Sequence, residues 1–131
     1  MKAVVDTNVL VFDTFEDSEF HSEAAAGLDS LERWSVPSMV FHELVWFLKS
    51  HEIPVSRANS KVEEYLTHEK TAFVPNTTDD VRFAASKMKS YHEYNDLVIL
   101  AAAKRLDLPL FSFDKSLRET ARQNSVRVLR Q

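Results

Sequence analysis

The chain has 131 residues, 44% of them hydrophobic and none of them cysteine, and a formal net charge of −4. This length predicts one domain over residues 1–131 with one hydrophobic core, and the missing cysteines exclude disulfides, thiolate metal sites and a catalytic thiol. A single glycine, Gly27, excludes glycine-rich phosphate-binding loops, and the absence of a long apolar run or an apolar N-terminal segment predicts a cytoplasmic protein without a membrane partner.

Strands and helices are predicted to alternate along the whole chain. The first half is predicted to contain, in order, a strand at 2–5, helices at 8–15 and 21–31, a strand at 34–36, a helix at 39–49 capped by Ser38, a helix that opens at Ser56, and a strand at 71–74. The second half is predicted to contain a helix that starts at Thr77 or Thr78, a buried helix that begins at Asn95 and Asp96, a strand at 109–113, a helix at 116–122 and an edge strand at 126–129. This alternation predicts a parallel sheet with helices on both faces.

Three aspartates are predicted to lie at one edge of this sheet. Asp6 follows the first strand and Asp114 follows the strand at 109–113, and parallel α/β sheets bind ligands at the carboxyl ends of their strands. Asp96 begins a buried helix, and the N-terminus of such a helix can point toward the same edge. Each aspartate could instead only cap its helix, because aspartate accepts hydrogen bonds from free backbone N–H groups.

Glu43 stands in the middle of a strongly apolar helix. Eight of the ten residues at 39–48 are apolar, so we expect this helix to be buried over most of its circumference. A mid-helix glutamate cannot be a cap, and no Lys or Arg lies one turn before or after it. Because burial of an unpaired carboxylate costs several kcal/mol, Glu43 needs a cation, a proton or a cleft, unless it forms a polar strip with His42.

The four carboxylates together predict a metal site. At one edge of the sheet they would repel each other, and sites built from carboxylate oxygens suit Mg²⁺ or Mn²⁺. Without these four acids the chain has 16 acids for 16 bases, so the site could account for the whole net negative charge. A divalent ion lowers the pKa of a bound water and neutralises charge on a phosphoryl group. The pattern therefore predicts hydrolysis of a phosphodiester.

The acidic segments resemble the four motifs of PIN-domain proteins. They are Val4–Asn8, Glu43 in the second long helix, Asp96–Ile99 and Phe111–Asp114, in this order over nearly the whole chain. The length is similar to that of VapC-type toxins of type II toxin–antitoxin modules. The resemblance implies an α/β fold that is a three-layer α/β/α sandwich with a central, mainly parallel sheet of four to five strands. It also implies a Mg²⁺- or Mn²⁺-dependent endoribonuclease that leaves a 5′-phosphate and a 3′-hydroxyl, forms a homodimer, and is inhibited by a cognate antitoxin whose tail enters the acidic groove.

Carried over position by position, the resemblance implies four metal-binding and catalytic acids: Asp6, Glu43, Asp96 and Asp114. Glu43 is expected either to ligate the metal or to orient the attacking water. Thr7 or Asn8, together with Ser112, match polar positions that orient a carboxylate or metal-bound water. Ser116 stands where many members of this family have a further acid. The sequence therefore leaves open whether the site holds one metal ion or two.

The C-terminal quarter of the chain is basic. Residues 104–131 contain seven bases and three acids, whereas residues 1–32 contain one base and eight acids. This excess is either a solvated helix face or a surface that contacts RNA phosphates. In the second case Lys115 and Arg118, which lie closest in sequence to Asp114, are expected to hold the RNA.

Large aromatic side chains are expected to fill the core. Those that stay exposed could form a dimer face or an antitoxin face. The expected core aromatics include Phe12, Phe15, Phe20, Trp34, Trp46 and Phe47.

Two other classes of enzyme or domain would need different residues directly after the first predicted strand. A receiver-like phosphoacceptor domain would need paired acids after the first strand, and a haloacid-dehalogenase-type phosphatase would need a second aspartate two residues after Asp6. Thr7 and Asn8 follow Asp6 instead, which disfavours both. An RNA-processing nuclease without an antitoxin, and a non-catalytic metal- or RNA-binding adaptor, stay open as alternatives.

Overall fold

A four-stranded parallel sheet forms the centre of the molecule. The computed structural model describes residues 1–129. The strands are β1 (Lys2–Val5), β2 (Arg33–Pro37), β3 (Thr71–Val74) and β4 (Leu110–Phe111), in the order β3-β2-β1-β4, and every neighbouring pair is parallel. The predicted α/β fold with a mainly parallel sheet of four to five strands is confirmed.

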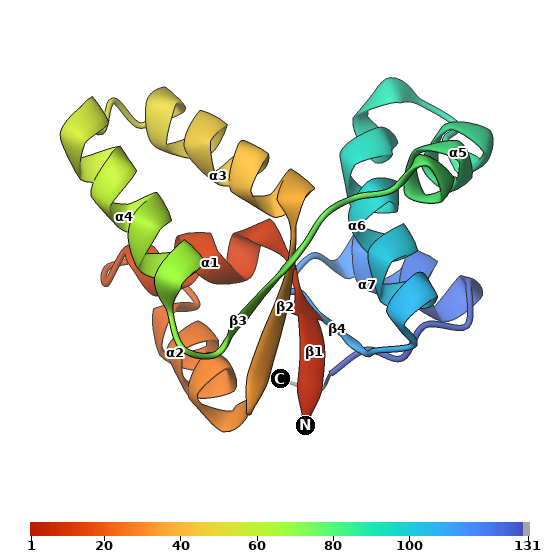
Figure 1. Cartoon of the computed structure of the whole chain (residues 1–131), viewed down its shortest axis with the longest axis horizontal. Coiled ribbons are helices and arrows are strands. Elements are labelled where there is room, and N and C mark those ends of the chain that lie inside the picture. The colour runs from red at the N-terminus through yellow and green to blue at the C-terminus, as the bar shows by residue number, and fades with distance from the viewer. Residues whose placement is uncertain (130–131) are drawn as a thin grey trace.

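Helices cover both faces of the sheet. On one side lie α1 (Thr7–Thr14), α2 (His21–Ser30), α3 (Ser38–Ser50) and α4 (Val55–Thr67), and on the other lie α5 (Thr78–Lys87), α6 (Tyr94–Leu106) and α7 (Lys115–Gln123) (Figure 1). A 3-10 turn, η1 (Tyr91–Glu93), leads into α6. The molecule therefore has the three layers of an α/β/α sandwich. Among the helices formed by residues 1–129, none is long and apolar enough to cross a membrane.

Strand β1 lies in the middle of the core because its side chains are apolar on both faces. Residues 3–5 are fully buried, as expected for a strand that helices cover from both sides. The chain leaves this strand at Asp6, whose backbone N–H donates to the carbonyl of Phe111 at 3.0 Å. The carboxyl ends of β1 and β4 therefore meet at the start of α1.

Helix α2 packs closely on β4 through the only glycine of the chain. A Cβ atom at Gly27 would overlap the aromatic ring of Phe111. Phe111 is buried, and its carbonyl accepts the hydrogen bond from Asp6. Glycine thus lets α2 approach the strand that supports Asp6.

Two helices start one residue earlier than predicted, and a proline precedes each of them. Ser38 directly follows Pro37 and is the first residue of α3, so the prediction that it caps this helix is wrong. Val55 directly follows Pro54 and begins α4 one residue before the predicted Ser56. Because proline disfavours the helical conformation of the residue before it, neither helix can extend further toward the N-terminus.

The C-terminal strands are shorter than predicted. The strand expected at 109–113 has two residues, and beyond it the backbone N–H of Phe113 donates to a side-chain atom, Asn8 Oδ1, at 3.3 Å instead of continuing the sheet. The edge strand expected at 126–129 is reduced to an isolated parallel bridge at Val128. The remaining predicted elements are present, with ends that differ by a few residues.

The aromatic side chains divide between the core and the surface. Trp34 is buried, and its Nε1–H donates to the carbonyl of Leu28 at 2.9 Å. Trp46 is 64% exposed, and its neighbour Val45 is exposed as well. The prediction that α3 is buried over most of its circumference is therefore wrong, since its core face is narrow. That face consists of Val40, Phe41, Leu44 and Leu48.

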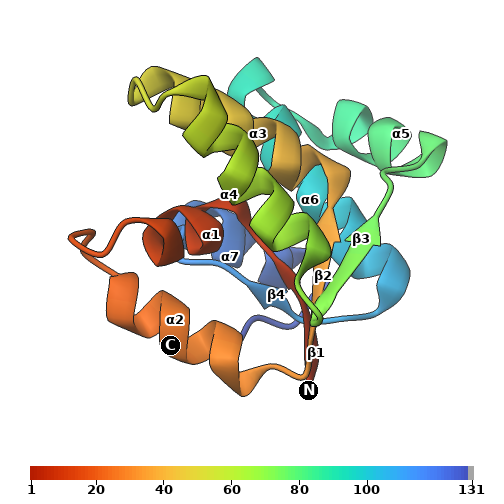
Figure 2. The ribbon, with the colours of Figure 1, turned by 60° about the vertical axis from the view of Figure 1, so that its left-hand side comes forward.

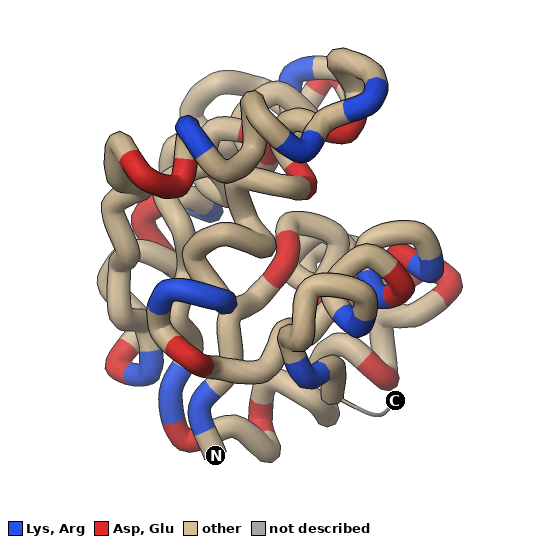
Figure 3. Tube along the Cα trace, turned by 90° about the vertical axis from the view of Figure 1, so that its right-hand side faces the viewer, with Lys and Arg blue, Asp and Glu red and all other residues tan. Residues whose placement is uncertain are grey.

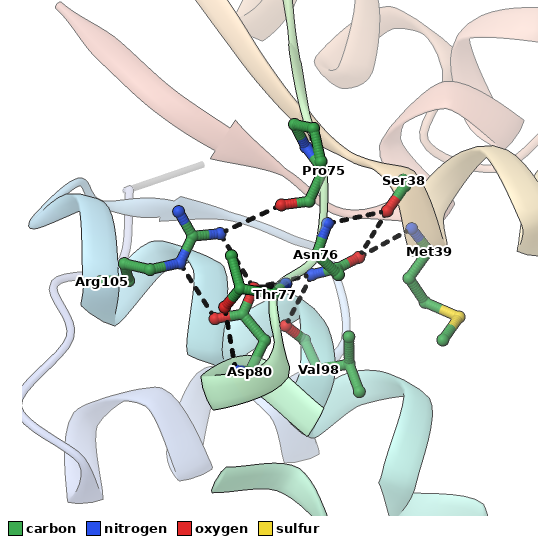
Figure 4. Close-up of polar contacts among 8 residues, drawn as sticks. All are labelled: Ser38, Met39, Pro75, Asn76, Thr77, Asp80, Val98 and Arg105. Atoms are coloured by element: carbon green, nitrogen blue, oxygen red, sulfur yellow. Dashed lines mark hydrogen bonds and ion pairs between the residues drawn. The ribbon is translucent and has the colours of Figure 1, made fainter. Parts of the chain in front are cut away.

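A polar cluster around Asn76 joins the loop after β3 to α3 and α6 (Figure 4). Asn76 Oδ1 accepts hydrogen bonds from the Met39 N–H and from Ser38 Oγ, both at 3.0 Å. Its Nδ2 donates to Asp80 Oδ2 at 3.1 Å. Asn76 therefore caps α3, the role that sequence reasoning gave to Ser38.

Asp80 is the centre of this cluster and is almost fully buried. Arg105 of α6 donates to both of its carboxylate oxygens, at 3.0 and 2.9 Å, and the Thr77 N–H donates to Oδ2 at 3.1 Å. Burial by itself would raise the pKa of Asp80, but the hydrogen bonds from Arg105, Thr77 and Asn76 outweigh burial and lower it. The cluster therefore holds α3 and α6 in a defined relation to each other.

We expect Asp80→Asn to lower the free energy of unfolding at neutral pH by about 2 kcal/mol, because the new amide N–H₂ faces donors and Arg105 loses its partner. Since the folded pKa lies below the ordinary value of 3.8, the wild-type advantage should shrink as the pH falls below that value. Urea unfolding measures both effects. Asp79→Asn is the matched control on the same helix, since Asp79 is 85% exposed and should change stability by less than about 0.5 kcal/mol. Equal stability of the two variants would contradict the role given to Asp80.

Candidate active site

The four predicted acids line one pocket of about 630 Å³: Asp6, Glu43, Asp96 and Asp114. Thr7 and Asn8 line it as well. Strands β1 and β2 run side by side into α1 and α3, which bring two of the acids to this end of the sheet (Figure 2). The other two come from the first turn of α6 and from the residue before α7. Among the described residues that line the pocket, none is Lys or Arg.

Asp6 is the most deeply buried of the four acids, with 4% of its surface exposed. Its Oδ1 accepts from the Thr7 N–H at 2.7 Å and its Oδ2 accepts from Ser112 Oγ at 2.6 Å. Burial raises the pKa of Asp6 to about 6, because the hydrogen bonds from Ser112 and Thr7 do not offset burial and the nearby charges of Glu43 and Asp114. Asp6 therefore caps α1 and also faces the pocket.

Asp96 lies in the first turn of α6 and is half-buried. The helix begins two residues earlier, at Tyr94, so Asp96 is not its cap. Burial, followed by the negative charges of Asp6, Asp114 and Glu43, raises the pKa of Asp96 to about 7. Within residues 1–129 its carboxylate accepts no hydrogen bond, which leaves it available to a ligand.

Glu43 is held by two neutral groups from other helices. Its Oε1 accepts from Thr7 Oγ1 of α1 at 2.6 Å, and its Oε2 accepts from Asn95 Nδ2 of α6 at 3.3 Å. No Lys or Arg within residues 1–129 pairs with it. The two donors therefore fix the position of the carboxylate and leave most of its charge uncompensated.

Asp114 and Asp6 share a contact through Ser112. The Ser112 hydroxyl donates to Asp6 and accepts from the Asp114 N–H at 3.0 Å. Asp114 Oδ1 in turn accepts from the Leu117 N–H at 3.0 Å and caps α7. The polar positions Thr7, Asn8 and Ser112 thus all make contacts that orient carboxylates or the loop that carries them.

The donor set of this pocket fits a hard divalent cation. Four carboxylates from separate elements provide oxygen ligands of the kind that Mg²⁺ and Mn²⁺ prefer. Burial, and after it the charges of neighbouring carboxylates, raise the pKa values of Asp6 and Asp96, and no Lys or Arg among the described lining residues offsets these effects. In their present positions, however, no group of three or more described His, Asp or Glu side chains is arranged to hold an ion. The carboxylates would therefore have to move to share an ion.

Lys115 and Arg118 do not line the pocket. Lys115 is exposed at the start of α7, and Arg118 lies half-buried one turn later, with a buried Nε that has no hydrogen-bond partner among the described residues. On the side of the molecule formed by α5, α6 and α7, Lys and Arg positions alternate with Asp and Glu positions (Figure 3). The predicted role of Lys115 and Arg118 in RNA binding stays a prediction.

Sequence reasoning missed the apolar part of the pocket and one donor. Asn95 was noticed only as part of a helix start, although its position next to Asp96 placed it near the acids. The lining residues that it missed are Val11, Phe12, Phe15, Asp17, Ser18, Phe47 and His51. Helical spacing from Asn8 and from Glu43 could have identified several of them, because residues three or four apart share one face.

Comparison with known proteins identifies the fold of the chain. A model of the PIN domain family matches residues 3–123. VapC20 of Mycobacterium tuberculosis, described as a toxin that cleaves the sarcin-ricin loop, superimposes with a TM-score of 0.78 and 14% identity over 90% of this chain and 94% of that chain. No curated protein sequence matches the chain significantly.

Two further solved structures are toxin–antitoxin complexes. VapBC2 of Rickettsia felis, bound to a DNA fragment from its promoter, has a TM-score of 0.70 and 15% identity over 98% of each chain. A toxin–antitoxin complex from Klebsiella pneumoniae has a TM-score of 0.64 and 19% identity over 88% of this chain and 89% of that chain. At these identities the likeness shows a shared fold.

Burial of Asp96, together with repulsion from the neighbouring carboxylates, should make the metal-free protein less stable as the pH rises. Because the pKa of Asp96 is about 7 in the folded chain and ordinarily 3.8, the folded state binds more protons between these values and the free energy of unfolding falls. We expect Asp96→Asn to remove about 2 kcal/mol of the fall that wild type shows between about pH 4.5 and about pH 7.5, measured by urea unfolding in EDTA. Asp79→Asn should behave like wild type. An equal fall in Asp96→Asn and wild type would contradict the electrostatic coupling.

Proposed function

This chain belongs to the PIN domain family, and from that premise we propose that it is a metal-dependent endoribonuclease that hydrolyses phosphodiester bonds of RNA. One observation carries the proposal: the four predicted acids, from separate elements, line a single pocket together with Asp17, and no Lys or Arg within residues 1–129 lines it. Perturbed carboxyl pKa values in a concave site are typical of functional acids.

The four acids would hold Mg²⁺ or Mn²⁺ in this pocket. A bound ion of this kind supplies a water of lowered pKa and neutralises charge on the phosphoryl group. Asp96 is the acid most available for coordination, because it has no hydrogen-bond donor within residues 1–129 to give up. Asp6 and Asp114 are kept near each other by Ser112.

The polar neighbours position the acids and the attacking water. Thr7 Oγ1 and Asn95 Nδ2 hold the two oxygens of Glu43, so that Glu43 can act as a ligand or orient the water. Attack of the water oxygen on phosphorus breaks the bond to the 3′ oxygen and leaves a 5′-phosphate and a 3′-hydroxyl. Lys115 and Arg118 would hold the RNA on the α7 side.

We further propose that the chain is the VapC-like toxin of a type II toxin–antitoxin module, acts in the cytoplasm, forms a homodimer and is inhibited by a cognate antitoxin. The similarity to VapBC2 and to the Klebsiella complex supports this proposal. An exposed apolar surface supports a protein partner as well. This surface lies at α3 and α4 and contains a groove of about 450 Å³. The groove is lined by Val45, Lys49, Ile53, Val55, Ala58, Asn59 and Val62.

Loss of either of two acids should abolish cleavage. We expect Asp6→Asn and Asp96→Asn each to lower the rate of Mg²⁺- or Mn²⁺-dependent cleavage of RNA by about a hundredfold or more, because each removes an ion ligand. Cleavage is measured on end-labelled RNA, and circular dichroism checks that the fold persists. Asp79→Asn, an exposed acid outside the pocket, should cleave like wild type. Wild-type rates in both pocket variants would refute the assignment.

A separate measurement distinguishes an enzyme or metal-binding protein from an adaptor without a metal site. Ions that bind the folded chain at about 100 times their Kd add about 2.7 kcal/mol to the free energy of unfolding. We therefore expect Mg²⁺ or Mn²⁺ to raise the thermal midpoint of wild type and to have little effect on a variant that combines Asp6→Asn with Asp96→Asn. An unchanged thermal midpoint of wild type over a full titration with either ion would refute the proposed metal site.

A further inference from the structure

The pocket that contains the four acids has an aromatic end. Besides the acids and their polar neighbours, it is lined by the rings of Phe12, Phe15, Phe47 and His51. Phe12 also packs edge-on against Phe20, with ring centroids 5.3 Å apart, and both side chains are half-buried. The other three rings gather where α1 and α3 end.

Two helices form the walls that connect the acidic end to the aromatic end. On α3, Glu43, Phe47 and His51 follow each other at intervals of four residues and lie on one face. The rise of about 1.5 Å per residue separates Glu43 from Phe47 by about 6 Å along the helix axis. Along α1 the lining passes in the same way from Asn8 to Phe15. Both walls therefore change from polar to aromatic in the same direction.

The three rings are packed together and not merely close in sequence. Phe47 and His51 stack with ring centroids 4.1 Å apart and an interplanar angle of 23°. Phe15 lies 5.9 Å from Phe47 and 6.2 Å from His51. Phe15 and Phe47 are half-buried and His51 is exposed. The cluster thus offers preformed aromatic surface to whatever enters the pocket.

We propose that this aromatic end is a nucleobase subsite, so that the substrate is single-stranded RNA with an unstacked base next to the scissile phosphate. This inference rests on the proposed function. A nucleotide joins a phosphate to a flat aromatic base, and the pocket joins carboxylates that suit a phosphate-binding ion to rings that suit a base. A base that lies against Phe47 and His51 cannot stay stacked and paired in a duplex.

A second hollow continues the path beyond the aromatic end. It has a volume of about 330 Å³ and shares Phe15 with the first pocket. Arg57 and Lys61 of α4 line it. Lys61 pairs with Glu64 at 3.0 Å, and Arg57 is exposed without an ion pair among the described residues. Arg57 and Lys61 are placed to contact the phosphate of the nucleotide next to the one whose nucleobase is bound.

The test compares RNAs with and without bases. Fluorescence anisotropy measures the affinity of wild type, in EDTA, for a short fluorescein-labelled single-stranded RNA of mixed sequence, for the same strand made abasic throughout, and for the corresponding duplex. Stacking of one base typically contributes enough to change affinity by about tenfold. We expect wild type to prefer the strand with bases by at least that factor over both other probes.

The variant Phe47→Leu removes a ring from the subsite but keeps an apolar side chain. We expect it to lose the preference for the strand with bases. Trp46→Leu is the matched control, because Trp46 is the next residue on α3, is aromatic and exposed, and does not line the pocket. It should keep the wild-type preference.

Three outcomes would overturn the inference: equal affinity of wild type for the intact and abasic strands, an unchanged preference in Phe47→Leu, or binding of only a protein partner at the aromatic end. The proposed function is judged separately, by cleavage with Mg²⁺ or Mn²⁺. Base-dependent binding without cleavage supports the subsite and refutes the nuclease. Cleavage that is equally fast on intact, abasic and duplex RNA supports the nuclease and refutes the subsite.

Discussion

Concentrated negative charge at the end of a buried strand is the constraint on which the rest of this structure depends. Asp6 has to leave the apolar core at a point where three other acids meet. Hydrogen bonds from Ser112 and Thr7 hold its carboxylate but do not cancel its charge, and the pKa stays raised. The four acids can stay close together because the helices that carry them are held by other contacts. One example is the polar cluster of Asn76, Asp80 and Arg105, which joins α3 to α6.

Asp6 and Asp80 show how one fold treats two buried aspartates differently, pairing one with a cation and leaving the other without one among the described residues. Both are aspartates with almost no exposed surface. Asp80 receives a bidentate hydrogen bond from Arg105 and its pKa is lowered, whereas Asp6 receives only neutral donors and its pKa is raised. The first arrangement stabilises the link between α3 and α6. The second stores an electrostatic cost that a bound cation would relieve.

Much of the architecture could be predicted because apolar patterns report burial. The continuous apolar run before Asp6 predicted a buried first strand, and Asp6 itself predicted the edge where the pocket lies. The start of α3 was not predictable, because its cap is Asn76, a residue far away in sequence. The extent of the last strands was not predictable either, since side chains such as Asn8 take the hydrogen bonds that the sheet would have used.

The pocket itself was predicted only on its polar side. Glu43 stood out because a mid-helix glutamate cannot be a cap, whereas the three aspartates, each of which could cap a helix, were singled out by their order and by their places at the ends of strands and helices. Phe15 and Phe47 were assigned to the core, because an aromatic residue that lines a cavity has the same helical spacing as one that packs inside. Trp46 was assigned there for the same reason, and it lies on the opposite, exposed face of α3.

The contact between Gly27 and Phe111 makes helix α2, which carries none of the four acids, sensitive to a single methyl group. An added Cβ would push on the ring of Phe111, and the carbonyl of that residue anchors the backbone of Asp6. A substitution that displaces Asp6 therefore need not lie among the acids. The effect of a side chain added at Gly27, on an outer helix, would reach the acidic end of the pocket through the sheet.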